Sequence, residues 1–240
     1  MLDFHSHILP GIDDGSKNME MSVEMIRQSI RQGITGIVLT PHFYAALDEP
    51  EAFFRRREAA AQKLFDAARE IPDCPKLLLG AEVHYYRGMS HSAVLERFCI
   101  GQSSAILVEM PFRAWGRQEI RELGEIRSRL GLQVVVAHVD RYLSRLRGSE
   151  LELLHAEADA LLQANADFFL RRLTRRKAVH MLRDGLIDLL GSDCHNLEER
   201  APNLGPAAAY IESKLGPNAL AEMDHRARRI FDAERVPSHV

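Results

Sequence analysis

The chain has 240 residues, 46% of them hydrophobic, and a formal charge of −3 at pH 7. This length suits one large α/β domain or two small ones, and the nearly balanced charge gives no indication of a nucleic acid or an anionic membrane as partner. Apolar runs such as Val134–Ala137 are too short to span a bilayer, and no secretory signal pattern opens the chain. Cys74, Cys99 and Cys194 have no paired spacing, so we expect a cytoplasmic protein without disulfides or a transmembrane segment.

Strands and helices are predicted to alternate along the chain. Apolar residues spaced by three or four, such as Met21, Met25 and Ile26, indicate a helix, and short runs of Val, Ile and Leu indicate buried strands. In chain order the pattern predicts strand Leu2–His5, helix Met19–Gln32, strand Ile34–Thr40, helix Pro50–Ile71, strand Lys76–Glu82, helix Met89–Phe98, strand Ser104–Glu109, helix Gln118–Leu130, strand Leu132–His138, helix Glu150–Gln163, strand Ala166–Leu170, helix Arg175–Asp184, strand Leu186–Ser192 and helices Ala207–Lys214 and Asn218–Phe231.

This alternation is typical of a single α/β domain with parallel strands, here over residues 1–240. The sequence contains no long linker, low-complexity tract or clear repeat that would divide it. Seven successive βα units favour a distorted, seven-stranded (β/α) barrel of the TIM type. A doubly wound open sheet is the alternative.

The first predicted strand runs directly into a His-x-His motif. Residues two apart on a strand point to the same side, so His5 and His7 can direct both imidazoles at one metal ion. The turn-rich loop Gly11–Gly15 can bring the carboxylate of Asp13 or Asp14 back over the same point. Taken alone, the motif also fits two surface histidines beside a polar loop.

Metal-type ligands recur at the carboxyl ends of six of the seven predicted strands. They are His5 and His7 after the first strand, His42 after the second, Glu82 and Glu109 at the ends of the third and fourth, His138 at the end of the fifth, and Asp193 and His195 after the seventh. In a β/α barrel the active site lies at this end, so the sequence predicts a site for two or three metal ions. Imidazole and carboxylate ligands suit Mn²⁺, Fe or Zn²⁺, and such clusters commonly hydrolyse phosphate esters.

Five motifs in their order and spacing resemble a known family. They are His5–Gly15, Thr40–His42, Gly80–Val83, His138–Tyr142 and Ser192–Asn196. These segments resemble the polymerase and histidinol phosphatase (PHP) superfamily. Within it, the chain is most similar to the bacterial capsule-type, manganese-dependent protein-tyrosine phosphatases (CpsB-type). The resemblance covers nearly the whole chain and implies the distorted barrel of the PHP fold.

The resemblance implies three metal sites and two phosphate-binding arginines. His5, His7, Glu82 and Asp193 would hold one ion; Glu82, Glu109 and His138 a second; and Asp14, His42 and His195 a third. Arg141 and Arg200 stand where the family places arginines that bind phosphate. The implied substrate is phosphotyrosine on the tail of a bacterial tyrosine kinase that regulates capsular or extracellular polysaccharide synthesis. Cys194 lies between Asp193 and His195 and is interpreted as a packing residue, so a phosphocysteine intermediate is not expected.

Some alternatives remain open at this stage. The chain could be an L-histidinol-phosphate phosphatase, a PHP nuclease, or a non-catalytic regulator that binds phosphopeptides. After the sixth predicted strand the family has a small polar run with Asn and Ser, whereas this chain has the segment Phe168–Lys177. Its basic residues could attract an acidic or phosphorylated peptide, or they could be a solvated helix start. His84 is interpreted as a residue at the rim of the site.

Overall fold

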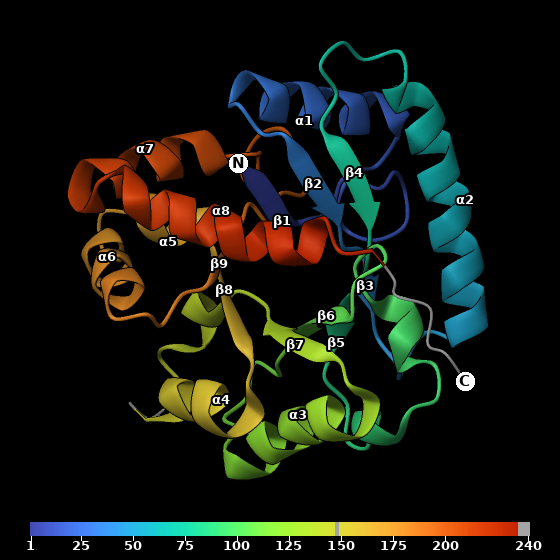
Figure 1. The fold of residues 1–240 in the computed structure, drawn as a ribbon. Coiled ribbons are helices and arrows are strands. Elements are labelled where there is room, and N and C mark those ends of the chain that lie inside the picture. The colour runs from blue at the N-terminus through green and yellow to red at the C-terminus, as the bar shows by residue number, and fades with distance from the viewer. Residues whose placement is uncertain (147–148, 235–240) are drawn as a thin grey trace.

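The computed structural model describes residues 1–146 and 149–234, in which strands and helices alternate (Figure 1). Residues 147–148 and 235–240 of the predicted domain lie outside that description. Within it, no helix has the length and apolar character needed to cross a membrane. The elements are β1 (Leu2–Ser6), α1 (Met19–Arg31), β2 (Gly36–Leu39), β3 (His42–Phe43), α2 (Pro50–Ala68), β4 (Lys76–Leu79), β5 (Glu82–His84), the 3₁₀ helices η1 (Met89–His91) and η2 (Leu95–Phe98), β6 (Ala105–Glu109), α3 (Arg117–Leu130), β7 (Gln133–Val136), η3 (Val139–Tyr142), α4 (Glu150–Ala158), β8 (Leu161–Asn165), α5 (Ala166–Leu170), α6 (Arg175–Arg183), β9 (Leu189–Gly191), α7 (Leu204–Leu215) and α8 (Pro217–Phe231).

The strands pair in parallel and form two sheets, with the orders β1-β2-β4 and β3-β5-β6-β7-β8-β9. The break between β2 and β3 falls at Pro41, which has no N–H to donate to a sheet ladder. A bridge between Ser6 and Cys194 joins β1 to the segment after β9, and His7 N donates to the Cys194 carbonyl at 2.9 Å. The fold is therefore mixed α/β with a curled parallel sheet, and the predicted single barrel of seven strands is not established.

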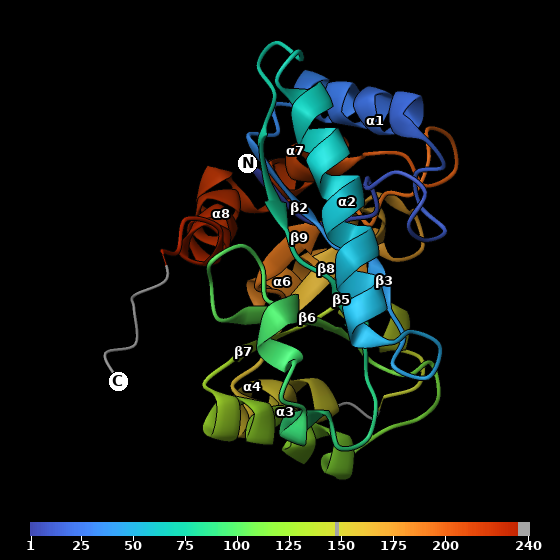
Figure 2. The same cartoon turned by 90° about the vertical axis from the view of Figure 1, so that its right-hand side faces the viewer.

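Helix α8 closes one end of the core. Its residues Ala227, Ile230 and Phe231 pack in one cluster with Leu2 and Phe4 of β1 and with apolar residues of β2, β6, β7 and β9. This one cluster joins α8 to five strands from both sheets, because the sheets curl around it. Figure 1 shows α8 crossing in front of β1 and β9, and Figure 2 shows it at the left edge, with α2 facing the viewer. The larger cluster packs the outer strand faces against the remaining helices.

Strand β1 contains a bulge where it leads into the cluster of histidines. Against β2, Asp3 pairs with Ile37 but Ser6 pairs with Leu39, so β1 contains one extra residue between these pairs. Bulges of this kind change the alternation of side chains and are frequent beside active sites. Phe4 packs in the apolar cluster, and His5, the next residue, points the other way and is fully buried beside β9.

The predicted sixth strand, Ala166–Leu170, is wrong, because these residues form α5. The strand is β8, which pairs with β7 and β9 and was predicted as the end of helix Glu150–Gln163. Helix α4 ends earlier because Asp159 takes a left-handed conformation, with φ 48°, and its N–H caps the last turn. Short apolar runs fit a strand or a buried helical turn equally well, so periodicity alone could not separate the two. The predicted helix Met89–Phe98 is likewise replaced by η1 and η2.

Gly191 marks the closest approach of β9 to β1. A Cβ at this position would lie 2.6 Å from His5 Cβ and 3.0 Å from His5 N. Because the obstacle includes backbone, the two segments would have to separate, and we expect Gly191→Ala to lower the free energy of unfolding by about 1–3 kcal/mol. Thermal unfolding followed by circular dichroism would register this as a fall in Tm of roughly 2–4 °C per kcal/mol.

Gly116→Ala is the matched control for this prediction. Its Cβ would have its nearest neighbour, Glu150 Oε1, at the ordinary contact distance of 3.5 Å. We expect a much smaller fall in Tm for this variant. Equal falls for the two alanine variants would contradict the steric explanation.

Candidate metal centre

All nine predicted metal-type ligands converge at the carboxyl ends of the strands. Their potential ligand atoms form three groups, and within each group these atoms lie within 4.8 Å of one another. The groups are His7, Asp14, His42 and His195; His5, His7 and Asp193; and His42, Glu82 and Glu109. His138 adjoins the third group, with Nε2 2.8 Å from Glu82 Oε1 and 3.4 Å from Glu109 Oε1. The periodic placement in the sequence thus becomes one cluster in space.

Glu82 occupies the centre of this cluster. Its fully buried carboxylate has Oε2 2.9 Å from His42 Nδ1 and 3.3 Å from Nε2 of both His5 and His7. Burial alone would raise the pKa of Glu82, but the charge on His5 and the close imidazoles of His138 and His42 hold it well below its ordinary value. The central carboxylate is therefore ionised and surrounded by imidazole.

Several buried atoms in the cluster lack the hydrogen bonds that such atoms normally make. Glu82 Oε2, His42 Nδ1 and His195 Nε2 are buried without a hydrogen-bond partner. Each buried polar atom left in this state costs on the order of 1–3 kcal/mol. Imidazole nitrogens and carboxylate oxygens that converge in a buried site, several of them without a hydrogen-bond partner, fit a site for divalent metal ions.

The two neighbouring acids of the first loop have different positions. Asp13 lies behind His7, with Oδ2 2.8 Å from His7 Nδ1 and accepting from His42 N at 3.0 Å. Asp14 faces the cluster, with Oδ1 3.5 Å from His42 Nε2 and 3.4 Å from His195 Nε2. The imidazole of His195 lowers the pKa of Asp14. Asp13 can therefore fix the orientation of His7, as carboxylates behind metal-binding histidines do, while Asp14 joins the ligand groups.

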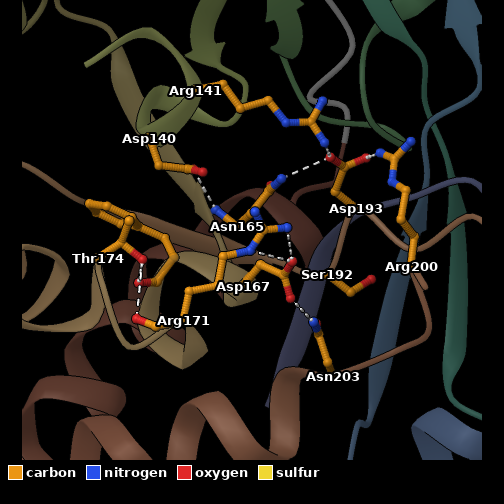
Figure 3. Close-up of a pocket in the computed structure, with 11 residues that line it drawn as sticks. Asp140, Arg141, Asn165, Asp167, Arg171, Thr174, Ser192, Asp193, Arg200 and Asn203 are labelled. Atoms are coloured by element: carbon orange, nitrogen blue, oxygen red, sulfur yellow. Dashed lines mark hydrogen bonds and ion pairs between the residues drawn. The ribbon is translucent and has the colours of Figure 1, made fainter. Parts of the chain in front are cut away.

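Asp193 connects the cluster to a polar pocket (Figure 3). Arg141 and Arg200 donate to its carboxylate from either side, Arg200 at 2.7 Å, and Asn165 Nδ2 donates to it at 2.8 Å. Burial would raise the pKa of Asp193, but the charges on His5 and Arg141 lower it. The pocket encloses about 380 Å³ and contains both predicted arginines in its wall.

The backbone is strained at two of the candidate ligands. His138 and Asp193 have φ values of 31° and 52°, in the left-handed region that residues other than glycine rarely adopt. The other non-glycine residues in this region, among those described, are Asp73 and Asp159. Strain at buried positions in a cluster of ionisable groups is typical of functional sites.

Two polar residues of β8 complete the site and were not predicted. Gln163 Oε1 accepts from His138 N at 2.8 Å and lies 3.1 Å from His5 Nδ1, so it holds two candidate ligands in place. Asn165 accepts from Gln163 Nε2 at 3.1 Å and contacts Asp193. The signal was present as the alternation in Leu161–Asn165, but these residues had been predicted as helix and loop. Strand β8, which stands where the sixth strand was expected, therefore ends with the polar residues Gln163 and Asn165, upstream of the segment Phe168–Lys177.

His84 lies at the edge of the cluster. Its Nδ1 is 2.9 Å from Glu109 Oε2, and about a third of the side chain is exposed. Tyr44 packs between His42 and His84, with ring centroids 5.3 Å and 5.2 Å away. These positions agree with the prediction that His84 is a rim residue.

Comparison with known proteins gives a consistent family. The model of the family described as "Capsular polysaccharide synthesis, CpsB/CapC" matches residues 1–229. The chain is 28% identical over 245 residues to the tyrosine-protein phosphatase CpsB of Streptococcus pneumoniae, covering 97% of this chain and 99% of that protein. It is 30% identical over 225 residues to the tyrosine-protein phosphatase YwqE of Bacillus subtilis strain 168, covering 90% of this chain and 85% of that protein.

Comparison with solved structures supports the same relationship. A chain from the crystal structures of YwqE from Bacillus subtilis and CpsB from Streptococcus pneumoniae, described as unique metal-dependent tyrosine phosphatases, superposes with a TM-score of 0.86 at 25% identity, covering 98% of this chain and 95% of that one. The phosphotriesterase homology protein of Escherichia coli shares the fold, with a TM-score of 0.52 at 11% identity, covering 96% and 98% of the two chains. From its motifs, its fold and the match to the family model, this chain belongs to the capsular polysaccharide synthesis CpsB/CapC family.

Proposed function

We propose that the chain is a metal-dependent protein-tyrosine phosphatase. The main observation for this proposal is the buried cluster of histidines and carboxylates, in which several atoms have no hydrogen-bond partner and which adjoins Arg141 and Arg200. The relatives named as tyrosine-protein phosphatases cover nearly all of the chain, and all nine ligand-type positions are filled. A catalytically inactive, phosphopeptide-binding relative would have no need to preserve that set.

The proposed metal content is two or three divalent ions, with Mn²⁺ as the native metal. One ion is assigned to His5, His7, Glu82 and Asp193, a second to Glu82, Glu109 and His138, and a third to Asp14, His42 and His195. Proximity also brings His42 close to Glu82 and Glu109, so the second and third sites adjoin. Such ions polarise phosphoryl oxygens and make water a nucleophile near neutral pH.

Arg141 and Arg200 are proposed to bind the phosphoryl group. Their side chains are about one-third exposed, and each uses one Nη2 atom to hold Asp193. A guanidinium group has five N–H donors, so both arginines retain donors for phosphate oxygens. A permanent positive charge on either side of the phosphoryl group would stabilise the negative charge that develops in the transition state.

Phe112 supports an aromatic substrate. It follows β6 and is one of three large apolar side chains, among the residues described, that are strongly exposed, at 45%. Its ring lies nearly parallel to that of His138, at 6.0 Å and 18°. An exposed aromatic face beside the cluster suits the phenyl ring of phosphotyrosine. A phenolate leaving group, with a pKa near 10, also needs less help from an acid than an alkoxide does.

The proposal extends to the substrate protein, the cellular compartment and the domain organisation. The substrate would be a phosphotyrosine-containing protein, such as the tail of a bacterial tyrosine kinase that regulates polysaccharide synthesis, acted on in the cytoplasm. Residues 1–240 would form one domain. The bridge from Ser6 to Cys194 supports closure of the curled sheets into a distorted barrel of seven strand positions.

The central prediction is metal-dependent turnover of phosphotyrosine. After chelation and addition of Mn²⁺, the protein should hydrolyse a phosphotyrosyl peptide in preference to histidinol phosphate. His42→Ala should lower kcat by roughly 100-fold, because it removes one donor from the cluster. Phosphate release and metal content would be measured on the same samples.

His225→Ala provides the control, because His225 lies on α8 outside the cluster. This variant should retain wild-type turnover and metal content. Preference for histidinol phosphate would change the substrate but retain the site. Metal-loaded protein that hydrolyses neither compound would contradict the proposal.

A second prediction concerns Phe112. Phe112→Ala should raise KM for a phosphotyrosyl peptide by roughly tenfold, since an aromatic contact of about 1 kcal/mol and its buried area are lost. Inhibition by inorganic phosphate should not change, because phosphate has no ring. Phe112→Tyr should restore the wild-type KM, and Leu47→Ala, which truncates another exposed apolar side chain, should have little effect. A parallel loss of phosphate inhibition in Phe112→Ala would show that Phe112 supports the cluster rather than the substrate ring.

A further inference from the structure

The junction of α5 and α6 carries a concentrated positive charge. We call these five residues the basic surface: Arg171, Arg172, Arg175, Arg176 and Lys177. Within residues 1–146 and 149–234, the one carboxylate at ion-pair distance from any of them is that of Asp167, which pairs with Arg171 at 2.7 Å. Arg175 stacks over the ring of Tyr210 at 5.4 Å. In a chain with a net charge of −3, this is a local excess of the opposite sign.

This charge does not serve the fold of α6. The helix begins at Arg175, so three of the cations stand in its first turn, which has no acidic residue and no side-chain cap. The helix macrodipole is positive at this end, and each cation there costs on the order of 0.3–1 kcal/mol. The helix is stabilised instead by its buried face, through Ala178, Val179, Met181 and Leu182. The three basic residues in the first turn therefore lower the stability of α6.

The basic surface adjoins the polar pocket beside the candidate metal centre through one of its members, Arg171. Arg171 and Thr174 line the same cavity as Arg141 and Arg200, and Figure 3 shows Arg171 on the side of Asn165 away from Arg141. A peptide with its phosphotyrosine at the cluster has neighbouring residues within reach of this wall. Leu173, 99% exposed, stands between Arg172 and Thr174 and presents an apolar contact among the cations.

We propose that the basic surface binds acidic side chains that flank the phosphotyrosine of a peptide substrate, and so sets a preference for acidic phosphopeptides. This inference rests on the proposed phosphatase function and adds a determinant of sequence specificity to it. Unpaired guanidinium and ammonium groups beside a site accelerate the encounter with an anionic partner and restrict its orientation. Exposed charges act over a Debye length of about 8–10 Å, so the preference depends on ionic strength.

The test compares two phosphotyrosyl peptides that differ only in their flanking residues, glutamate in one and glutamine in the other. The wild-type protein should have a kcat/KM roughly tenfold higher for the glutamate peptide at low salt, and this ratio should shrink as salt is added. The triple variant Arg172→Glu, Arg176→Glu, Lys177→Glu should lose the preference while turning over free phosphotyrosine at the wild-type rate. Acidic residues in the first turn of α6 favour the helix, so loss of folding would not explain that result.

A charge-matched variant on α2 and its C-cap residue is the control: Arg55→Glu, Lys63→Glu, Arg69→Glu. These residues are exposed, and Figure 1 places α2 and α6 on opposite sides of the molecule. The control should keep the preference for the glutamate peptide. Equal turnover of both peptides by the wild-type protein, or equal loss of preference in both triple variants, would overturn the proposal.

Binding of the unphosphorylated peptides, followed by fluorescence anisotropy, separates this inference from the phosphatase function. Tighter binding of the glutamate peptide by the wild-type protein than by the α6 variant would support the basic surface without any turnover. Absence of turnover with that binding preference intact would count against the phosphatase function alone. Equal binding of the two peptides by the wild-type protein would count against the basic surface alone.

Discussion

The buried carboxylate of Glu82 is the constraint on which the rest of this molecule depends. An ionised carboxylate in a protein interior is tolerated only where opposite charge and polar contacts replace water. Here the compensation comes from four imidazoles on three other segments of the chain: His5, His7, His42 and His138. The parallel strands must therefore end in register around one point, and the sheet has to curl for them to meet.

Further buried polar contacts fix the positions of the strand ends around Glu82. Gln163 uses one carbonyl oxygen to hold both the His5 ring and the His138 backbone, and it passes a hydrogen bond to Asn165. Asn165 in turn holds Asp193, whose backbone is strained. A network in which each member restrains the next is sensitive to the loss of any one of them. This explains how His138 and Asp193 can persist in a backbone conformation that costs on the order of 1–3 kcal/mol.

The sequence allowed the ligand groups to be predicted more accurately than the element that supports them. His5, Glu82 and Asp193 could be found because each lies at the carboxyl end of a segment that was predicted as a strand. Gln163 and Asn165 could not, because the segment after α4 has the length and composition of either a helical turn or a strand. The left-handed turn at Asp159 decides between them, and Asp is only one of several residues that adopt it. The bulge in β1 was equally hidden, since it depends on the register with β2.

The charged residues around Asp193 suit the proposed chemistry, whereas those in the first turn of α6 oppose the stability of that helix. Asp193 is ionised because His5 and two arginines surround it, and the same arginines keep donors free at the pocket wall. Arg171 stands across that pocket, and beyond it the first turn of α6 carries cations that interact unfavourably with the helix dipole. A sequence selected for stability alone would place acids there. Positive charge on both walls of one pocket is instead the distribution expected where an anionic chain must enter and a phosphoryl group must be held.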